Sequence, residues 1–330
     1  MVAAPDKFRG SAYAVEVARA VAAAAHGAGW TCDEAPVADG GEGTLDAFGG
    51  ANRMMIVSGP LGDPVEAPWL RRGGLAVIEM AKASGLDLVG GAEHNDPIAA
   101  STYGTGELIA AAVEGGARRV IVGLGGSATT DGGLGALRAL EPLHRMKGVD
   151  IVAACDVETR FLDAAHVFAP QKGASEAQVK LLHRRLERLA QMYAEEYRVD
   201  VHDLPGSGAA GGLGGGLAVA GAELTPGFDV VADELGLAER IEAADLVVTG
   251  EGFLDEESFR GKAVGGVAGL AAAVGVPVLA VVGDSVDRLE IPRGWTLEIV
   301  SLVDRFGDQR ARSETLELVT EVCADHLDTP

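Results

Sequence analysis

Short apolar runs alternate with helix-length segments at both ends of the 330-residue chain. The runs at 2–4, 31–37, 245–248, 278–282 and 297–300 predict five strands. The intervening segments predict helices, among them one over residues 11–26 with Ser11 as N-cap and a closing helix from Ser313. Strands that alternate with helices in this way predict an α/β fold built on an open parallel sheet.

Polar clusters follow three of these predicted strands, at residues 5–11, 39–44 and 249–255. In open parallel sheets, ligands bind beyond the carboxyl ends of the strands. We therefore expect the three clusters to share one edge of the sheet.

The middle of the chain has a different pattern. Residues 54–58, 62–64 and 76–80 indicate pieces of a sheet that contains a hairpin, followed by a helix near 104–115 and a strand at 150–155. A long helix from Ser175 to about Arg198 begins with a capping box formed by Ser175 and Gln178. We predict a second α/β domain over 51–226, inserted into a discontinuous first domain of residues 1–50 and 227–330.

The stretch RRVIVGLGGSATTDGGLG, residues 118–135, joins a buried strand to a helix through a turn of glycines and hydroxyls. Bare backbone N–H groups in such a turn suit a bound anion, and the Asp131 carboxylate suits a metal ion or a proton. A tight turn with Thr129 or Asp131 as helix N-cap explains the same residues equally well. Both interpretations stay open at this point.

The composition limits the possible partners. The net charge of −22 argues against nucleic acid, because affinity for phosphate backbones comes from clustered positive charge. Three distant cysteines give neither a disulfide framework nor zinc spacing and indicate a reducing compartment. The start, MVAAPDKFRG, lacks a signal-peptide pattern, and the uncharged run 263–283 splits into a helix and a strand. We expect a cytoplasmic protein without a membrane span.

The sequence contains one candidate nucleotide-binding motif. GSGAAG at 206–211 fits the dinucleotide fingerprint G-x-G-x-x-G, but the segment before it is polar rather than strand-like. The Walker A motif is absent from the sequence. Carboxylates recur in the glycine-bearing loops, with basic side chains near similar turns, and together these suggest handling of Mg²⁺ and phosphate. They are Asp6, Asp39, Glu42, Asp131, Glu251 and Asp255, with Lys7, Arg9, Lys172 and Lys262.

Seven motifs over nearly the whole chain resemble those of bacterial glycerate kinases of type I, in the family's order. They are PDKFRGS (5–11), ADGGEGT (38–44), YGTGEL (103–108), GGSATTDGG (125–133), PQKGA (170–174), PGSGAAGGLG (205–214) and TGEGFLDEESFRGK (249–262). The resemblance implies a flavodoxin-like domain with an inserted α/β domain and an active site in the cleft between them. It also implies phosphorylation of D-glycerate, most often at the 2-hydroxyl, with ATP and Mg²⁺.

On this basis we assign roles to individual residues. The catalytic set is Lys7, Arg9, Asp39, Asp131 and Lys262, with Arg9 as the partner of the glycerate carboxylate. The nucleotide would be held by Gly125, Gly126, Ser127, Ala128, Gly132, Gly250 and Glu251. Mg²⁺ would be held by Asp39, Glu42 and Asp131. A homo-oligomer is also possible.

The chain departs from the family pattern at several positions. Arg9 stands where the family usually has lysine, Thr130 where it usually has asparagine, and the segments 140–149 and 156–166 are shorter. These departures leave open a catalytically silent family member that senses a ligand. A dinucleotide-dependent oxidoreductase that uses the GSGAAG loop is the other alternative.

Overall fold

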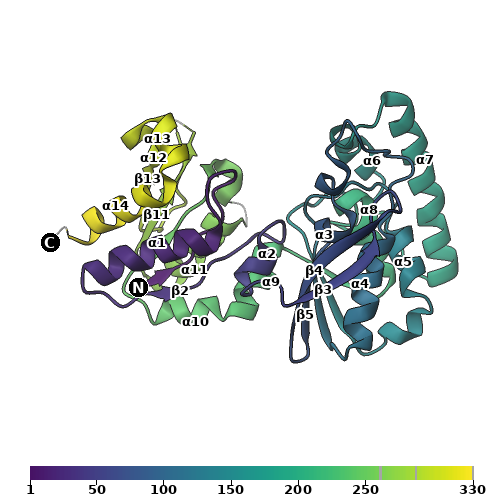
Figure 1. The fold of residues 1–330 in the computed structure, drawn as a ribbon, viewed down its shortest axis with the longest axis horizontal. Helices are drawn as coiled ribbons and strands as arrows, with labels where there is room; N and C mark the ends of the chain where they lie inside the picture. Colours follow the sequence, from purple (N-terminus) through teal and green to yellow (C-terminus); the bar gives the residue numbers. More distant parts are fainter. Residues whose placement is uncertain (260–261, 287, 329–330) are drawn as a thin grey trace. The chain divides into compact units, whose positions relative to one another are not determined.

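The structure is a computed structural model that describes residues 1–259, 262–286 and 288–328 (Figure 1). The chain divides into two compact units. The first consists of Met1–Asp39 and Phe228–Pro330, and the second of Gly40–Gly227. Each is built on its own sheet.

The first unit contains a five-stranded sheet in which every neighbouring pair is parallel. The order across the sheet is β13 (Leu297–Ser301), β11 (Val278–Val282), β9 (Val247–Thr249), β1 (Val2–Ala3) and β2 (Asp33–Glu34). Numbered along this unit, the order is 2-1-3-4-5, which is that of flavodoxin-like folds. The predicted flavodoxin-like parallel sheet is confirmed. A separate pair, β10 (Phe253–Leu254) and β12 (Asp284–Ser285), follows β9 and β11.

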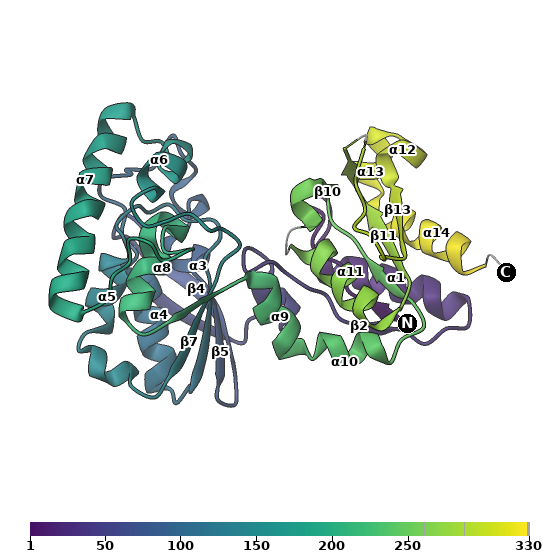
Figure 2. The same cartoon turned by 180° about the vertical axis from the view of Figure 1, so that it is seen from behind.

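Helices lie on both faces of this sheet (Figure 1 and Figure 2). Ala3, Val248 and Leu279 share a buried cluster with apolar side chains of α1 (Ala14–Gly27) and α14 (Thr315–Leu327). Ala280 and Val282 pack instead with Val264 of α11 (Ala263–Val274). The remaining helices of the unit are α9 (Gly227–Leu235), α10 (Leu237–Glu242), α12 (Leu302–Phe306) and α13 (Asp308–Ser313).

The start of α1 differs from the prediction. Tyr13, not Ser11, is the residue before the first helical turn, and its N–H donates to Glu16 Oε2 at 3.0 Å. The Ser11 hydroxyl turns back and donates to the carbonyl oxygen of Phe8 at 3.3 Å. Residues 8–12 therefore form a separate tight loop before the helix.

The second unit contains a six-stranded mixed sheet, antiparallel at one edge and parallel from β5 onward. In order across the sheet the strands are β3 (Arg53–Ser58), β4 (Pro64–Arg72), β5 (Leu75–Glu79), β6 (Arg119–Gly123), β7 (Asp150–Ala154) and β8 (Glu223–Thr225). The hairpin-bearing sheet expected for this region is present, and β8 was not anticipated.

One face of this sheet is covered by α4 (Tyr103–Glu114), α5 (Leu134–Leu140) and α8 (Ala209–Val219), whose apolar side chains share its buried cluster. A second cluster joins α5 to α6 (Ala164–Phe168) and α7 (Glu176–Met192). The capping box at the start of α7 is confirmed, since the Ser175 side chain accepts from the Gln178 N–H. Short helices α2 (Thr44–Ala47) and α3 (Ala81–Ser84) complete the unit.

The first boundary between the units lies earlier than we predicted, and the second lies one residue later. Residues 40–50 belong to the second unit, and Gly227 does as well. The reason is a buried carboxylate at the end of β5. Glu79 Oε1 accepts the N–H groups of Gly43 at 3.0 Å and Leu45 at 2.9 Å and so ties the loop to the second sheet.

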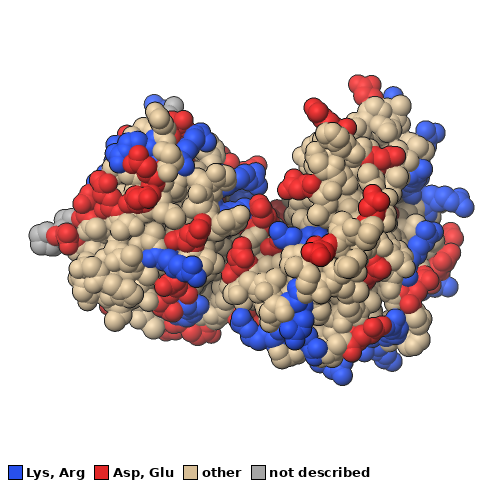
Figure 3. All heavy atoms as spheres, in the orientation of Figure 1, with Lys and Arg blue, Asp and Glu red and all other residues tan. Residues whose placement is uncertain are grey.

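The uncharged run 263–283 forms α11 and β11, as its pattern predicted. Among the described residues, no helix combines the length and apolar character that crossing a bilayer requires. Acidic and basic side chains are interspersed on the visible face of each unit (Figure 3).

Candidate functional site

The candidate site of the first unit lies at the carboxyl ends of β1 and β9. These strands are neighbours, and the pairing continues past them because the Asp6 N–H donates to the Gly250 carbonyl at 2.8 Å. From β1 the chain runs to β2 on one side, while β9 lies on the other. This is the point where strand order reverses, at which open α/β sheets bind their ligands.

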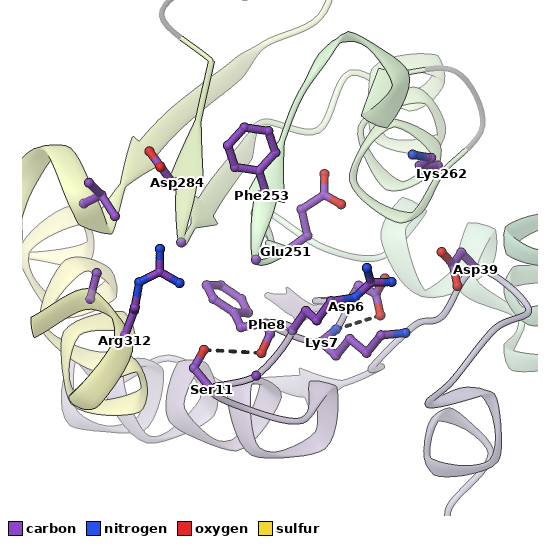
Figure 4. Close-up of a pocket in the computed structure, with 16 residues that line it drawn as sticks. Asp6, Lys7, Phe8, Ser11, Asp39, Glu251, Phe253, Lys262, Asp284 and Arg312 are labelled. Carbon is purple, nitrogen blue, oxygen red and sulfur yellow. Dashed lines mark hydrogen bonds between the residues drawn. The ribbon is translucent and has the colours of Figure 1, made fainter. Parts of the chain in front are cut away.

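A cavity of about 580 Å³ opens at this point and lies within the first unit (Figure 4). Five predicted site residues line it: Lys7, Arg9, Asp39, Glu251 and Lys262. They come from the loops after β1, β2 and β9 and from the start of α11. The motif that ends in Lys262 also contains Arg260 and Gly261, which lie outside the described residues.

The cavity lining is strongly charged. Its carboxylates are Asp6, Asp39, Glu251 and Asp284, and its cations are Lys7, Arg9, Lys262 and Arg312. Asp6 was among the carboxylates that the sequence suggested for Mg²⁺ and phosphate, although it was given no specific role, whereas Asp284 and Arg312 were not predicted. Asp284 comes directly after β11, so the rule that ligands lie beyond strand ends would have identified it. Arg312 lies on α13, far along the chain, and carries no comparable signal.

Asp6 is buried, with 7% of its surface exposed. Burial raises the pKa of its carboxyl to about 7, and the negative charge of Asp39 adds to the rise. Lys7 and Arg9 oppose this shift, and the Lys7 N–H donates to Asp6 Oδ1 at 2.6 Å. Two carboxylates that repel each other beside a cavity fit a divalent cation, which would relieve the repulsion.

Glu251 has a similar environment. Burial raises the pKa of its carboxyl to about 7, although a hydrogen bond from Ser258 works against the rise. Its Oε1 atom is buried and has no hydrogen-bond partner in the described part of the chain. A carboxylate oxygen with unused lone pairs in a charged cavity is equipped to accept a proton or a ligand hydrogen bond.

The metal assignment has mixed support. Across residues 1–259, 262–286 and 288–328, no group of three or more His, Cys, Asp or Glu side chains is arranged to hold a metal. Mg²⁺ does not need such a group, because it commonly takes one or two carboxylates together with substrate phosphates. Asp6 and Asp39 offer that kind of site. Glu42 belongs to the second unit and is exposed.

The glycine loop after β6 lies in the second unit. The N–H groups of Gly125, Gly126 and Ser127 donate to no acceptor in the part of the chain that the structure describes. The Ala128 N–H donates to the Ser84 carbonyl at 2.9 Å, and the Gly132 N–H donates to the Gly211 carbonyl at 3.0 Å. The amides of Ala128 and Gly132 are therefore occupied within the chain, and their assignment to phosphate binding stays a prediction.

Asp131 has its oxygens occupied within the second unit. Its Oδ2 accepts from the Thr102 N–H and hydroxyl, both at 2.9 Å, and from the Gly135 N–H at 3.1 Å. Its Oδ1 accepts from the Gly133 N–H at 3.1 Å. These bonds join the starts of α4 and α5, which is the arrangement expected of a capping residue. Its catalytic and metal roles stay predictions.

Gly250 has a structural reason to be glycine. A Cβ atom at this position would lie 2.0 Å from the carbonyl oxygen of Val281, so a side chain is excluded by the neighbouring strand β11. Gly250 does not line the cavity, whereas Glu251 and Gly252 do. We therefore assign Gly250 to strand packing rather than to nucleotide binding.

The GSGAAG loop lacks the context of a dinucleotide site. The segment before it, residues 198–205, forms no strand. The Ser207 hydroxyl donates to the carbonyls of Val201 and Leu204, at 2.9 and 2.6 Å. A Cβ at Gly212 or Gly216 would collide with Gly132 or Gly133, at 2.7 Å in each case. These glycines allow α8 to pack closely, and the dinucleotide interpretation loses its support.

Comparison with known proteins identifies relatives of this chain. Residues 1–143 and 141–326 match the model of the glycerate kinase family. The glycerate 2-kinase of Escherichia coli K12 is 40% identical over 334 residues, which cover 88% of this chain and 87% of that protein. The glycerate kinase of Halalkalibacterium halodurans is 40% identical over 326 residues, covering 86% and 85%.

A solved structure is similar over almost the full length. The crystal structure of a candidate glycerate kinase 2 from Salmonella typhimurium LT2 has a TM-score of 0.84 and 34% sequence identity. The match covers 98% of this chain and 97% of that one. Both units therefore have counterparts in a single solved chain.

Proposed function

The chain belongs to the glycerate kinase family, and from that premise we propose that it transfers the γ-phosphoryl group of ATP to D-glycerate. The 2-hydroxyl is the proposed acceptor, because the Escherichia coli relative is named a glycerate 2-kinase. The observation that carries the proposal is the charged cavity at the carboxyl ends of β1 and β9. It combines cations suited to an anionic substrate with carboxylates suited to a metal ion and a proton.

We assign the substrate carboxylate to Arg9. This side chain lines the cavity and is exposed, so its guanidinium is accessible to a ligand. A guanidinium binds a carboxylate through two parallel hydrogen bonds, which also fixes the orientation of the acceptor hydroxyl. Lys7 and Lys262 supply further positive charge for the transferred phosphoryl group.

We propose that Glu251 accepts the proton of the acceptor hydroxyl. Its Oε1 is buried without a partner, and its pKa of about 7 suits a base that works near neutral pH. Asp6 and Asp39 would hold Mg²⁺, which when bound neutralises charge on the phosphoryl oxygens. The backbone N–H groups of Gly125, Gly126 and Ser127 are the proposed ligands of the ATP phosphates.

The decisive experiment is a coupled assay of ADP release with ATP, D-glycerate and Mg²⁺, followed by ³¹P NMR of the product. We expect ADP release that depends on both glycerate and metal, with phosphate on carbon 2. No glycerate-dependent ADP with any divalent metal would refute the kinase assignment. Binding of ATP or glycerate without turnover would identify the chain as a silent family member.

A further inference from the structure

A second cavity, of about 540 Å³, lies in the second unit beside α7. Its volume falls in the range of small-molecule sites. Apolar side chains make up much of its lining, namely Ile98, Leu134, Leu186, Leu189 and Met192. A three-carbon hydroxy acid has no surface to match such a lining, so this cavity suits a larger ligand with an apolar face.

The charged side chains around this cavity are two arginines and three carboxylates, one of which is Asp131. Arg185, Arg188, Glu195 and Glu196 line it and are all exposed. Among the residues that the structure describes, no ion pair joins these arginines to these glutamates. The glutamates lie in a π-helical turn, Tyr193–Tyr197, that follows α7. Turns of this kind occur often at functional sites.

The cavity also contains an unsatisfied polar group. Thr130 lines it and is 2% exposed, and its Oγ1 has no hydrogen-bond partner in the described residues. Burying a hydroxyl without a partner costs free energy, so a native orphan of this kind calls for an explanation. A ligand hydrogen bond at this position would supply the missing partner.

Thr130 belongs to the same loop as the three unbonded amides. It comes three residues after Ser127, so the two Cα atoms are at most about 11 Å apart along the chain. That distance is within the span of one nucleoside triphosphate. A ligand that places an aromatic base in the cavity can therefore extend its phosphates toward Gly125, Gly126 and Ser127.

We propose that this cavity binds the purine nucleoside of the phosphoryl donor. The base lies against the leucines, and the Thr130 hydroxyl bonds to its polar edge. Glu195 and Glu196 accept hydrogen bonds from the ribose hydroxyls or the exocyclic amine. The same carboxylates would repel phosphate groups, so the nucleoside end of the ligand lies beside them. This assignment rests on the proposed function for the identity of the donor, and it locates that donor on the second unit.

The test uses Thr130→Val, which removes the hydroxyl while nearly keeping the shape of the side chain. Thr129→Val is the matched control, because the Thr129 Oγ1 is also buried and unbonded but does not line the cavity. Thr130→Ser keeps the hydroxyl. Dissociation constants for adenosine and ADP would be measured by calorimetry on the full chain, with circular dichroism to check folding.

We expect Thr130→Val to weaken adenosine and ADP binding about 10-fold, a loss of ~1.4 kcal/mol, which is the size of one hydrogen bond. Thr130→Ser and Thr129→Val should stay within about threefold of the unmodified chain. Photolabelling with 8-azido-ATP, which needs no variant, should modify the segment 185–196. Unchanged binding in a folded Thr130→Val variant, or labelling confined to other segments, would overturn the proposal.

The outcome is separable from that of the proposed function. If Thr130→Val phosphorylates glycerate with a normal KM for ATP, the kinase function stands and the proposed nucleoside site is wrong. Adenosine binding that depends on Thr130 in a protein without glycerate-dependent turnover would retain the site and reject the kinase.

Discussion

The Lys172 ammonium nitrogen lies 2.7 Å from the Ser127 hydroxyl oxygen and donates to it. It also donates to the Thr129 carbonyl at 2.6 Å. Lys172 is 3% exposed, so a cation is buried directly beneath the glycine loop that follows β6. Burial lowers the pKa of this lysine to about 7, while the charge of Asp131 works in the opposite direction.

Stability should therefore depend on pH through Lys172. The folded pKa of about 7 lies below the ordinary lysine pKa of 10.5. Between these values the unfolded chain binds more protons than the folded one, so this group makes the protein more stable as pH rises. The gain approaches ~1.4 kcal/mol per pH unit within that window and is lost as pH falls toward 7.

The variant Lys172→Met, which keeps length and removes the titration, should lack this gain. Urea unfolding at pH 7.5, 8.5 and 9.5 would measure the difference in free energy of unfolding between the two proteins. We expect the difference to grow with pH in favour of the unmodified chain. Parallel pH dependences would show that Lys172 keeps its proton throughout the range.

Glu251→Gln tests the proposed base. The unmodified enzyme should gain kcat/KM as pH rises through about 7, because Glu251 must be ionised to accept the hydroxyl proton. The variant should lose at least ~10²-fold in kcat and no longer show that acid limb. Glu256→Gln, an exposed neighbour, is the control and should behave normally. If the rise in kcat/KM through about pH 7 persists in Glu251→Gln, another carboxylate accepts the proton of the acceptor hydroxyl.

Local patterns predicted the elements of the first unit well. The apolar run 278–282 became β11 with the expected bounds, whereas the run 31–37 pairs only at Asp33–Glu34. Strand length depends on which neighbours are present, and β2 is an edge strand paired with β1 alone. The capping box of α7 was predicted because both of its partners lie within four residues of sequence.

The site was harder to predict where distant segments decide the chemistry. Lys7, Arg9 and Glu251 follow strands, and the structure places them around one cavity. The amides of Ala128 and Gly132 are occupied by Ser84 and Gly211, far away in sequence. Asp6 was named only as one of several loop carboxylates and was given no specific role, because a single aspartate in a loop usually indicates a turn. Its burial and its proximity to Asp39 arise only in the folded chain.

Arg9→Ala tests the substrate contact. Loss of a charge-assisted hydrogen bond should raise the KM for glycerate about 30-fold, equivalent to ~2 kcal/mol, with a smaller effect on kcat. Arg9→Lys should recover part of the loss, because it keeps the charge but not the fork of donors. Arg19→Ala, exposed on α1, is the control. If Arg9→Ala raises the KM for ATP and leaves the KM for glycerate unchanged, Arg9 contacts the nucleotide and not glycerate.

Asp131 and Asp39 should respond differently to the same substitution. In Asp131→Asn, an amide replaces a carboxylate that accepts four hydrogen bonds, so an N–H group must face another donor. We expect a loss of about 2 kcal/mol in the free energy of unfolding. For a unit of this size, that corresponds to a Tm lower by roughly 4–8 °C.

In Asp39→Asn, the change falls in the charged cavity of the first unit, where the charge of Asp39 acts on Asp6 and where we propose that Asp39 holds Mg²⁺. Its Tm should stay within a few degrees of the unmodified protein, while kcat falls by at least ~10²-fold. Calorimetry and the ADP-release assay on both variants separate the two roles. If Asp131→Asn keeps its Tm and loses turnover, Asp131 acts in the chemistry, and the helix starts are held by the remaining bonds.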